Sequence, residues 1–158
     1  MSMTEALLIK ALRDNGLKVT PQRHLICRLI ASLDGHPSAE MIYDEAVRVM
    51  PTLSLKTVYT TLSELAQIGA VRLARFGTEN LRVDTDMMPH AHAVCTECGR
   101  LTDLPIAEEA LNALWEAADG WSFDVEGCEV VYRGRCRDCC QKRGSGACRR
   151  KANACHNN

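Results

Sequence analysis

The chain has 158 residues, 46% of them hydrophobic and only 4% aromatic, which suits one large or two small domains with a mainly aliphatic core. No segment approaches the roughly 20 consecutive apolar residues that cross a membrane. The N-terminus has neither the basic start nor the apolar run of a secretion signal. We therefore expect a cytoplasmic protein.

The net charge of −1 conceals an uneven distribution along the chain. Residues 1–84 carry ten basic and nine acidic residues, residues 85–132 carry one arginine and ten acidic residues, and residues 133–158 carry eight basic and one acidic. The acidic middle disfavours contact with nucleic acid. Such contact is expected from basic patches in the first half, with the basic tail as a further candidate.

Four helices are expected in the first half because suitable N-cap residues precede each of them. Thr4, Thr20, Ser38 and Ser54 can cap a helix through their side-chain oxygens, and Pro21 suits a first helical position. The sequence predicts helices from Thr4 to Gly16, from Thr20 to about Leu33, from Ser38 to about Met50, and from Ser54 to Gly69.

The fourth predicted helix has two contrasting faces. Its apolar residues recur at helical spacing, and its other face is polar without an acidic residue before Glu64. An ordinary solvated helix would include acids, so this face could enter a DNA major groove. The apolar residues are Leu55, Val58, Leu62 and Leu65, and the polar face has Lys56, Thr57, Thr60 and Ser63 with Tyr59 alongside.

A hairpin is predicted after these helices, with strands at residues 71–75 and 80–84. Helices followed by a basic hairpin indicate a winged-helix DNA-binding domain over residues 1–84. The alternative is a small α+β module with no role in DNA binding.

The second half, residues 85–140, is expected to form a small α/β domain, which makes the whole chain α+β. The pattern predicts strands at 91–94, 100–104, 123–125 and 129–132, and a helix at 106–118. Leu111, Leu114 and Trp115 are expected to face inward. The acidic helix and sheet could pair with a second copy. Residues 141–158 are rich in Gly, Ser, Ala, Asn and Arg, which predicts a disordered basic tail.

Two cysteine pairs predict a structural zinc site. Cys95 and Cys98 are separated by two residues and followed by Gly99, and Cys136 and Cys139 repeat the gap. Four thiolates would form a closed tetrahedral site that contributes on the order of 10 kcal/mol to folding. The alternatives are redox or free-thiol pairs, and Cys140 competes with Cys139 as the fourth ligand.

A second metal site is indicated by His90 and His92. On a strand, these residues face one way and Cys95 faces the other, so the imidazoles cannot easily share its zinc. Asp84, Asp103 and His36 are further candidate ligands, and a nitrogen and carboxylate set suits Fe²⁺, Mn²⁺ or Zn²⁺. The alternative is a pair of surface histidines.

Four stretches resemble the ferric uptake regulator family, in order and with matching spacing. The resemblance covers about residues 5–140 and leaves out the tail. The stretches are residues 16–23 (GLKVTPQR), 35–39 (GHPSA), 54–62 (SLKTVYTTL) and 90–99 (HAHAVCTECG).

This resemblance implies a homodimeric repressor of double-stranded operator DNA, with a C-terminal dimerisation domain and a structural zinc on the two cysteine pairs. It implies that Tyr59 contacts bases and that Arg23 contacts phosphate. The DNA-binding candidates are Arg23, Ser54, Lys56, Thr57, Tyr59 and Thr60.

Within the family, the chain is most similar to the peroxide-sensing, PerR-like branch. That branch binds Fe²⁺ or Mn²⁺ through three histidines and two aspartates and loses the metal when iron and peroxide oxidise a ligand histidine. Motif matching places these ligands at His36, Asp84, His90, His92 and Asp103, with His36 or His92 oxidised. No turnover is implied, so no enzyme is expected.

Two alternatives remain open from the sequence. One is an iron- or manganese-responsive repressor that does not sense peroxide, because the argument against the iron-uptake branch depends largely on Asp84, where that branch typically has glutamate. The other is a zinc-containing thiol redox protein.

Overall fold

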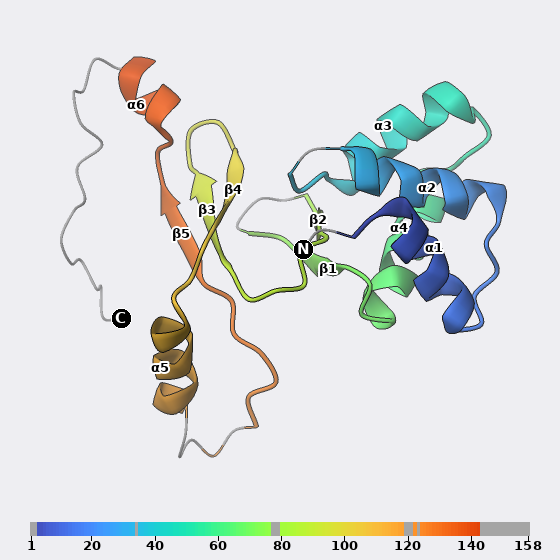
Figure 1. Ribbon diagram of the computed structural model, residues 1–158. Helices are drawn as coiled ribbons and strands as arrows, with labels where there is room; N and C mark the ends of the chain where they lie inside the picture. The colour runs from blue at the N-terminus through green and yellow to red at the C-terminus, as the bar shows by residue number, and fades with distance from the viewer. Residues whose placement is uncertain (1–2, 34, 77–79, 119–121, 123, 143–158) are drawn as a thin grey trace. The chain divides into compact units, whose positions relative to one another are not determined.

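The computed structural model describes residues 3–33, 35–76, 80–118, 122 and 124–142 (Figure 1). The chain divides into two compact units, the first spanning Met1–Pro89 and the second beginning at His90. The sequence had predicted a boundary after Asp84. Among the described residues, no helix combines the length and apolar character needed to cross a membrane.

The first unit contains the four helices that the sequence predicts. In each, the N-cap side chain accepts a hydrogen bond from the backbone N–H three residues later, which satisfies one of the unpaired donors of the first turn. Gly16 ends the first helix with φ 73°, a conformation that favours glycine. The helices are α1 (Glu5–Asp14), α2 (Pro21–Ser32), α3 (Ala39–Val49) and α4 (Leu55–Gln67).

An aliphatic core holds these helices together. The predicted apolar face of α4 packs into it, with Val58, Leu62 and Leu65 fully buried. Each such side chain contributes roughly 1.5–3 kcal/mol through burial. Cys27 of α2 also lies in the core, and burial raises the pKa of its thiol to about 11, so it stays protonated at neutral pH.

The predicted hairpin is present as strands β1 (Arg72–Ala74) and β2 (Arg82–Asp84), which pair antiparallel with Arg72 opposite Asp84. A bridge between Ser38 and Arg82 attaches the hairpin to the residue that caps α3. The residues between the strands at 77–79 lie outside the described residues. Four helices with an attached hairpin constitute a winged helix.

The second unit is a three-stranded sheet with two helices. Its centre is β3 (Ala91–Cys95), which pairs antiparallel with β4 (Leu101–Leu104) and parallel with β5 (Val131–Gly134). Helix α5 (Glu108–Ala118) lies between β4 and β5 in the sequence, and the short helix α6 (Arg137–Lys142), which the sequence did not predict, follows β5.

Two strand predictions in this unit need correction. The last strand, predicted at 129–132, begins at Val131, because the parallel register pairs β3 with residues 131–134. Asp124 and Val125, part of the strand predicted at 123–125, have no strand structure, and residue 123 lies outside the described residues. A strand requires a neighbour to satisfy its backbone hydrogen bonds, and the described chain pairs none with this segment. The predicted tail, beyond Lys142, also lies outside the described residues.

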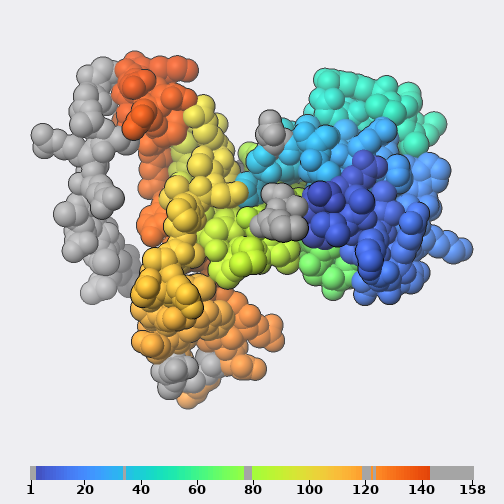
Figure 2. All heavy atoms as spheres, in the orientation of Figure 1, coloured from blue at the N-terminus to red at the C-terminus, as the bar shows by residue number. Residues whose placement is uncertain are grey.

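The prediction that α5 turns its apolar residues inward is wrong for the single chain. No side chain of Glu108–Ala118 is buried, Leu111 is half-buried, and Leu114 and Trp115 are each 39% exposed. Figure 2 shows the α5 segment at the surface of the second unit. Within the described parts of the chain, no layer covers this face, and an uncovered apolar face is typical of a protein–protein interface.

We expect a second copy of the chain to cover α5. Trp115→Glu places a charge in that interface and should convert the dimer to monomer, as measured by sedimentation velocity. Ala113→Glu, on the opposite side of α5, is the matched control and should leave the dimer intact. A Trp115→Glu protein that sediments as wild type would contradict this assignment.

Candidate metal centres and nucleic-acid interface

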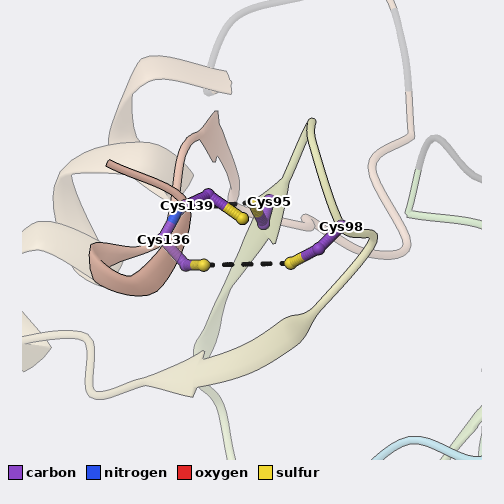
Figure 3. A group of neighbouring side chains, drawn as sticks. All are labelled: Cys95, Cys98, Cys136 and Cys139. Carbon is purple, nitrogen blue, oxygen red and sulfur yellow. Dashed lines mark hydrogen bonds between the residues drawn. The ribbon is translucent and has the colours of Figure 1, made fainter. Parts of the chain in front are cut away.

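Four cysteines converge at one end of the second unit (Figure 3). Cys95 ends β3, Cys98 lies in the following turn, Cys136 precedes α6 and Cys139 lies within it. Their sulfur atoms all lie within 4.8 Å of one another. The sulfurs of Cys98 and Cys136 are 3.8 Å apart, which matches the edge of about 3.8 Å for a tetrahedron of thiolates around zinc.

Backbone geometry brings the two pairs together. Gly99, at φ 70°, closes the first turn by donating its N–H to the Cys95 carbonyl at 2.9 Å. Parallel pairing of β3 with β5 sets Gly134 opposite Cys95, so Cys136 arrives two residues later, where its N–H donates to the Cys95 sulfur at 3.3 Å. The sheet register therefore determines which cysteines meet.

Without metal, the pKa values of Cys95 and Cys139 are shifted in opposite directions. Backbone N–H groups of Cys136 and Cys98 lower the pKa of Cys95 to about 6. Hydrogen bonds to Cys136 and Cys98 stabilise the thiol of Cys139 and raise its pKa to about 12. Zinc binds all four cysteines as thiolates. Zinc binding therefore releases protons, and the affinity for zinc falls as the pH falls.

The structure distinguishes Cys139 from Cys140 as the candidate fourth ligand of the cysteine cluster. Cys139 belongs to the cluster, whereas Cys140 is buried and its thiol lies 3.8 Å from the Arg135 carbonyl. Cys128 is exposed and is not part of this cluster. Cys148 and Cys155 lie outside the described residues.

One pair of residues beside the cysteines was missed by the sequence analysis. Arg100, just after the first cysteine pair, forms a 2.7 Å ion pair with Asp138, which lies between the cysteines of the second. The carboxylate of Asp138 raises the pKa of Arg100, with smaller contributions from Cys136 and Cys98. An arginine just after the first cysteine pair and an aspartate within the second would have been the available signal.

The first unit holds two of the candidate regulatory ligands close together. His36 precedes α3 and Asp84 ends β2, and both side chains are 3% exposed. The His36 Nε2 atom lies 3.6 Å from one carboxylate oxygen of Asp84. The ring of Phe76 contacts His36 edge-on, with centroids 5.8 Å apart.

The second unit brings the other three together. The Nε2 atoms of His90 and His92 are 3.0 Å apart, and an Asp103 oxygen lies 3.6 and 3.7 Å from them. Sheet register explains this, because His92 pairs with Asp103 across β3 and β4. Two imidazole nitrogens about 2.1 Å from one octahedral ion lie about 3.0 Å apart, so this arrangement fits a divalent metal.

The DNA-binding candidates of α4 divide into exposed and internally bonded residues. Lys56 and Thr60 are exposed, and Ser54 caps the helix through Thr57. The Tyr59 hydroxyl donates to the Glu40 carboxylate at 2.5 Å. This hydrogen bond lowers the pKa of Glu40 and raises that of Tyr59.

Arg23 is bonded inside the first unit. Its guanidinium donates to the Lys18 carbonyl at 2.8 Å and to Glu64 at 2.6 Å, which connects α2 with α4. A hollow of about 580 Å³ opens beside it, and none of its lining residues is acidic. The lining comprises Gly16, Leu17, Lys18, Thr20, Gln22, Arg23, Ser54, Lys56, Thr57, Thr60 and Thr61.

Comparison with known proteins identifies relatives of this chain. The ferric uptake regulator family model matches residues 14–133. The peroxide-responsive repressor PerR of Staphylococcus saprophyticus is 31% identical over 136 residues, which are 85% of this chain and 90% of the relative.

Solved structures agree with the fold. The ferric uptake regulator Fur of Helicobacter pylori has a TM-score of 0.71 at 19% identity, covering 87% of this chain and 94% of that one. Fur of Vibrio cholerae has a TM-score of 0.65 at 26% identity, covering 80% and 98%. The chain therefore belongs to the ferric uptake regulator family of metal-responsive repressors.

Proposed function

We propose that this protein is a metal-dependent repressor that releases operator DNA when peroxide oxidises a histidine of its regulatory metal site. The observation that carries the proposal is the composition of the two histidine and aspartate groups, above all the buried Asp84 beside His36. Similarity to peroxide-responsive repressors over 85% of the chain supports the same assignment.

The four cysteines are proposed to hold structural zinc. Cys95, Cys98, Cys136 and Cys139 supply a complete tetrahedral thiolate set, which leaves no position for a substrate. This closed site disfavours both hydrolytic chemistry and the alternative of a thiol redox protein, which needs a reactive pair free of metal.

The regulatory site is proposed to take Fe²⁺ or Mn²⁺. His36 and Asp84 from the first unit and His90, His92 and Asp103 from the second would be its ligands. When bound, Fe²⁺ would supply the redox chemistry that breaks the O–O bond of peroxide, so that one oxygen is added to a ligand imidazole, which is oxidised, and the other leaves as water. An oxidised ring is a poor ligand, so His36 or His92 would no longer hold the ion. Because each protein molecule is modified once, this is sensing and not enzymatic turnover.

DNA binding is assigned to the first unit. The polar face of α4 and the hollow next to it offer Lys56, Thr57 and Thr60 without a lining acid. A homodimer would present two such helices to paired half-sites of double-stranded DNA. Metal acts by favouring the conformation with higher DNA affinity. A cytoplasmic location follows from this proposal.

Peroxide sensing predicts a mass change on histidine. After anaerobic loading with Fe²⁺ and addition of peroxide, peptide mass spectrometry should find about 16 Da added to His36 or His92, in parallel with DNA release in a mobility-shift assay. Protein loaded with Mn²⁺ is the control and should keep its DNA. DNA release without histidine oxidation would show that peroxide acts elsewhere, for example by cysteine oxidation with zinc loss. Indifference to peroxide would favour the plain iron- or manganese-responsive repressor.

The zinc assignment predicts different outcomes at adjacent cysteines. Cys139→Ser removes a ligand and should reduce the zinc content from one ion per chain to nearly none, with large destabilisation of the second unit. Cys140→Ser should retain the zinc. Metal analysis and thermal unfolding measure both effects, and in wild type zinc retention should fall as the pH falls. Zinc loss in Cys140→Ser alone would reverse the assignment.

The DNA assignment predicts separable effects on α4. Lys56→Ala would remove a phosphate contact, so it should weaken binding to all DNA sequences. The slope of log affinity against log salt concentration should become shallower by about one. Tyr59→Phe removes a hydroxyl and should weaken operator binding about fivefold while affecting nonspecific DNA less. Arg48→Ala, on α3, is the control. Fluorescence anisotropy at several salt concentrations distinguishes these outcomes, and unchanged binding in both α4 variants would exclude α4 as the reading helix.

A further inference from the structure

One arginine of the first unit connects a proposed metal ligand to the segment that leads into the second. Arg72 lies on β1, and its Nε atom lies 3.5 Å from one carboxylate oxygen of Asp84. Its Nη2 atom donates to the carbonyl of Asp86 and, at 3.1 Å, to the carbonyl of Met88. A single guanidinium therefore contacts three points along residues 84–88.

The two oxygens of the Asp84 carboxylate face different partners. The oxygen nearer His36 lies 3.6 Å from that ring and accepts the Asp86 N–H at 2.8 Å. The other oxygen faces Arg72. Arg72 thus fixes the rotation of the carboxylate without occupying the oxygen directed at His36.

The segment Thr85–Met88 has one further attachment to the first unit and one internal hydrogen bond. The Met3 N–H donates to the Thr85 carbonyl at 3.2 Å, and within the segment the Met88 N–H donates to the Asp86 carboxylate at 3.1 Å. Met87 and Met88 are themselves exposed, at 40% and 63%. Hydrogen bonds rather than side-chain burial therefore hold Met88, which makes the position of the segment sensitive to Arg72.

We propose that Arg72 is a positioning residue that orients Asp84 for the metal and ties it to Thr85–Met88. The inference rests on the proposed function for the role of Asp84 as a ligand. Arg72 forms an ion pair with Asp84, and replacing such an outer partner of a ligating carboxylate commonly changes metal affinity 10- to 100-fold. A fixed segment also reduces the chain entropy that is lost when His90 and His92, which follow it in sequence, bind the same ion.

Arg72→Lys is the decisive variant because it keeps the positive charge and removes the planar fork that reaches a carboxylate and two carbonyls together. Without metal, the Asp86 and Met88 amides should exchange with deuterium about tenfold faster than in wild type. Mn²⁺ affinity, measured by electron paramagnetic resonance of the free ion, should fall about tenfold. Zinc content and thermal unfolding should not change.

Arg48→Lys is the matched control, because the same exchange of side chains occurs on α3, where Arg48 pairs with Glu45. Unchanged amide exchange in Arg72→Lys would overturn the attachment. Faster exchange with Mn²⁺ affinity within twofold of wild type would overturn the coupling to the metal. If wild type bound no Mn²⁺, the regulatory site of the proposed function and this coupling would both fail, while the exchange measurement would still decide whether Arg72 holds the segment.

Discussion

The parallel pairing of β3 with β5 is the constraint on which the second unit depends. It joins segments nearly 40 residues apart, and it carries Cys136 to Cys95. In the described part of this unit, the buried apolar side chains are only Ala91, Val94, Cys95 and Cys140. So small a core cannot offset the entropy of ordering the chain. Zinc bound by the four thiolates is proposed to supply the missing stability, together with a second copy over α5.

The first unit is stabilised in a different way. Its helices bury a continuous aliphatic cluster, and every helix begins at a side-chain cap. We therefore expect this unit to fold without metal. Its candidate regulatory ligands, His36 and Asp84, lie at the hairpin and the adjoining turn, so an ion bound there has little effect on the core. The structural metal site is thus assigned to thiolate ligands, and the regulatory metal site to imidazole nitrogen and carboxylate ligands.

Local patterns made much of this arrangement predictable. Capping residues, glycine ends and apolar periodicity depend on neighbours in the chain, so the first four helices were predicted closely. The paired cysteines and the alternation that separates His90 from Cys95 were equally local. Three other features could not be predicted from local patterns: the start of β5, the exposure of Trp115 and the Arg100–Asp138 ion pair. Each depends on which distant segment or second chain lies alongside. The Tyr59–Glu40 hydrogen bond and the Arg72–Asp84 ion pair could not be predicted for the same reason.

The Arg23–Glu64 pair has a consequence for how an operator would be selected. It braces α4 against α2, and Arg23 also holds the Lys18 carbonyl of the preceding loop. A helix held by this ion pair cannot rotate about its axis to fit an irregular groove without breaking a partly buried ion pair. If α4 binds in the DNA groove as proposed, most of the conformational change on binding must occur in the DNA duplex. Base steps that bend or narrow easily would then be favoured even where no side chain touches them, so part of the recognition code would reside in DNA stiffness.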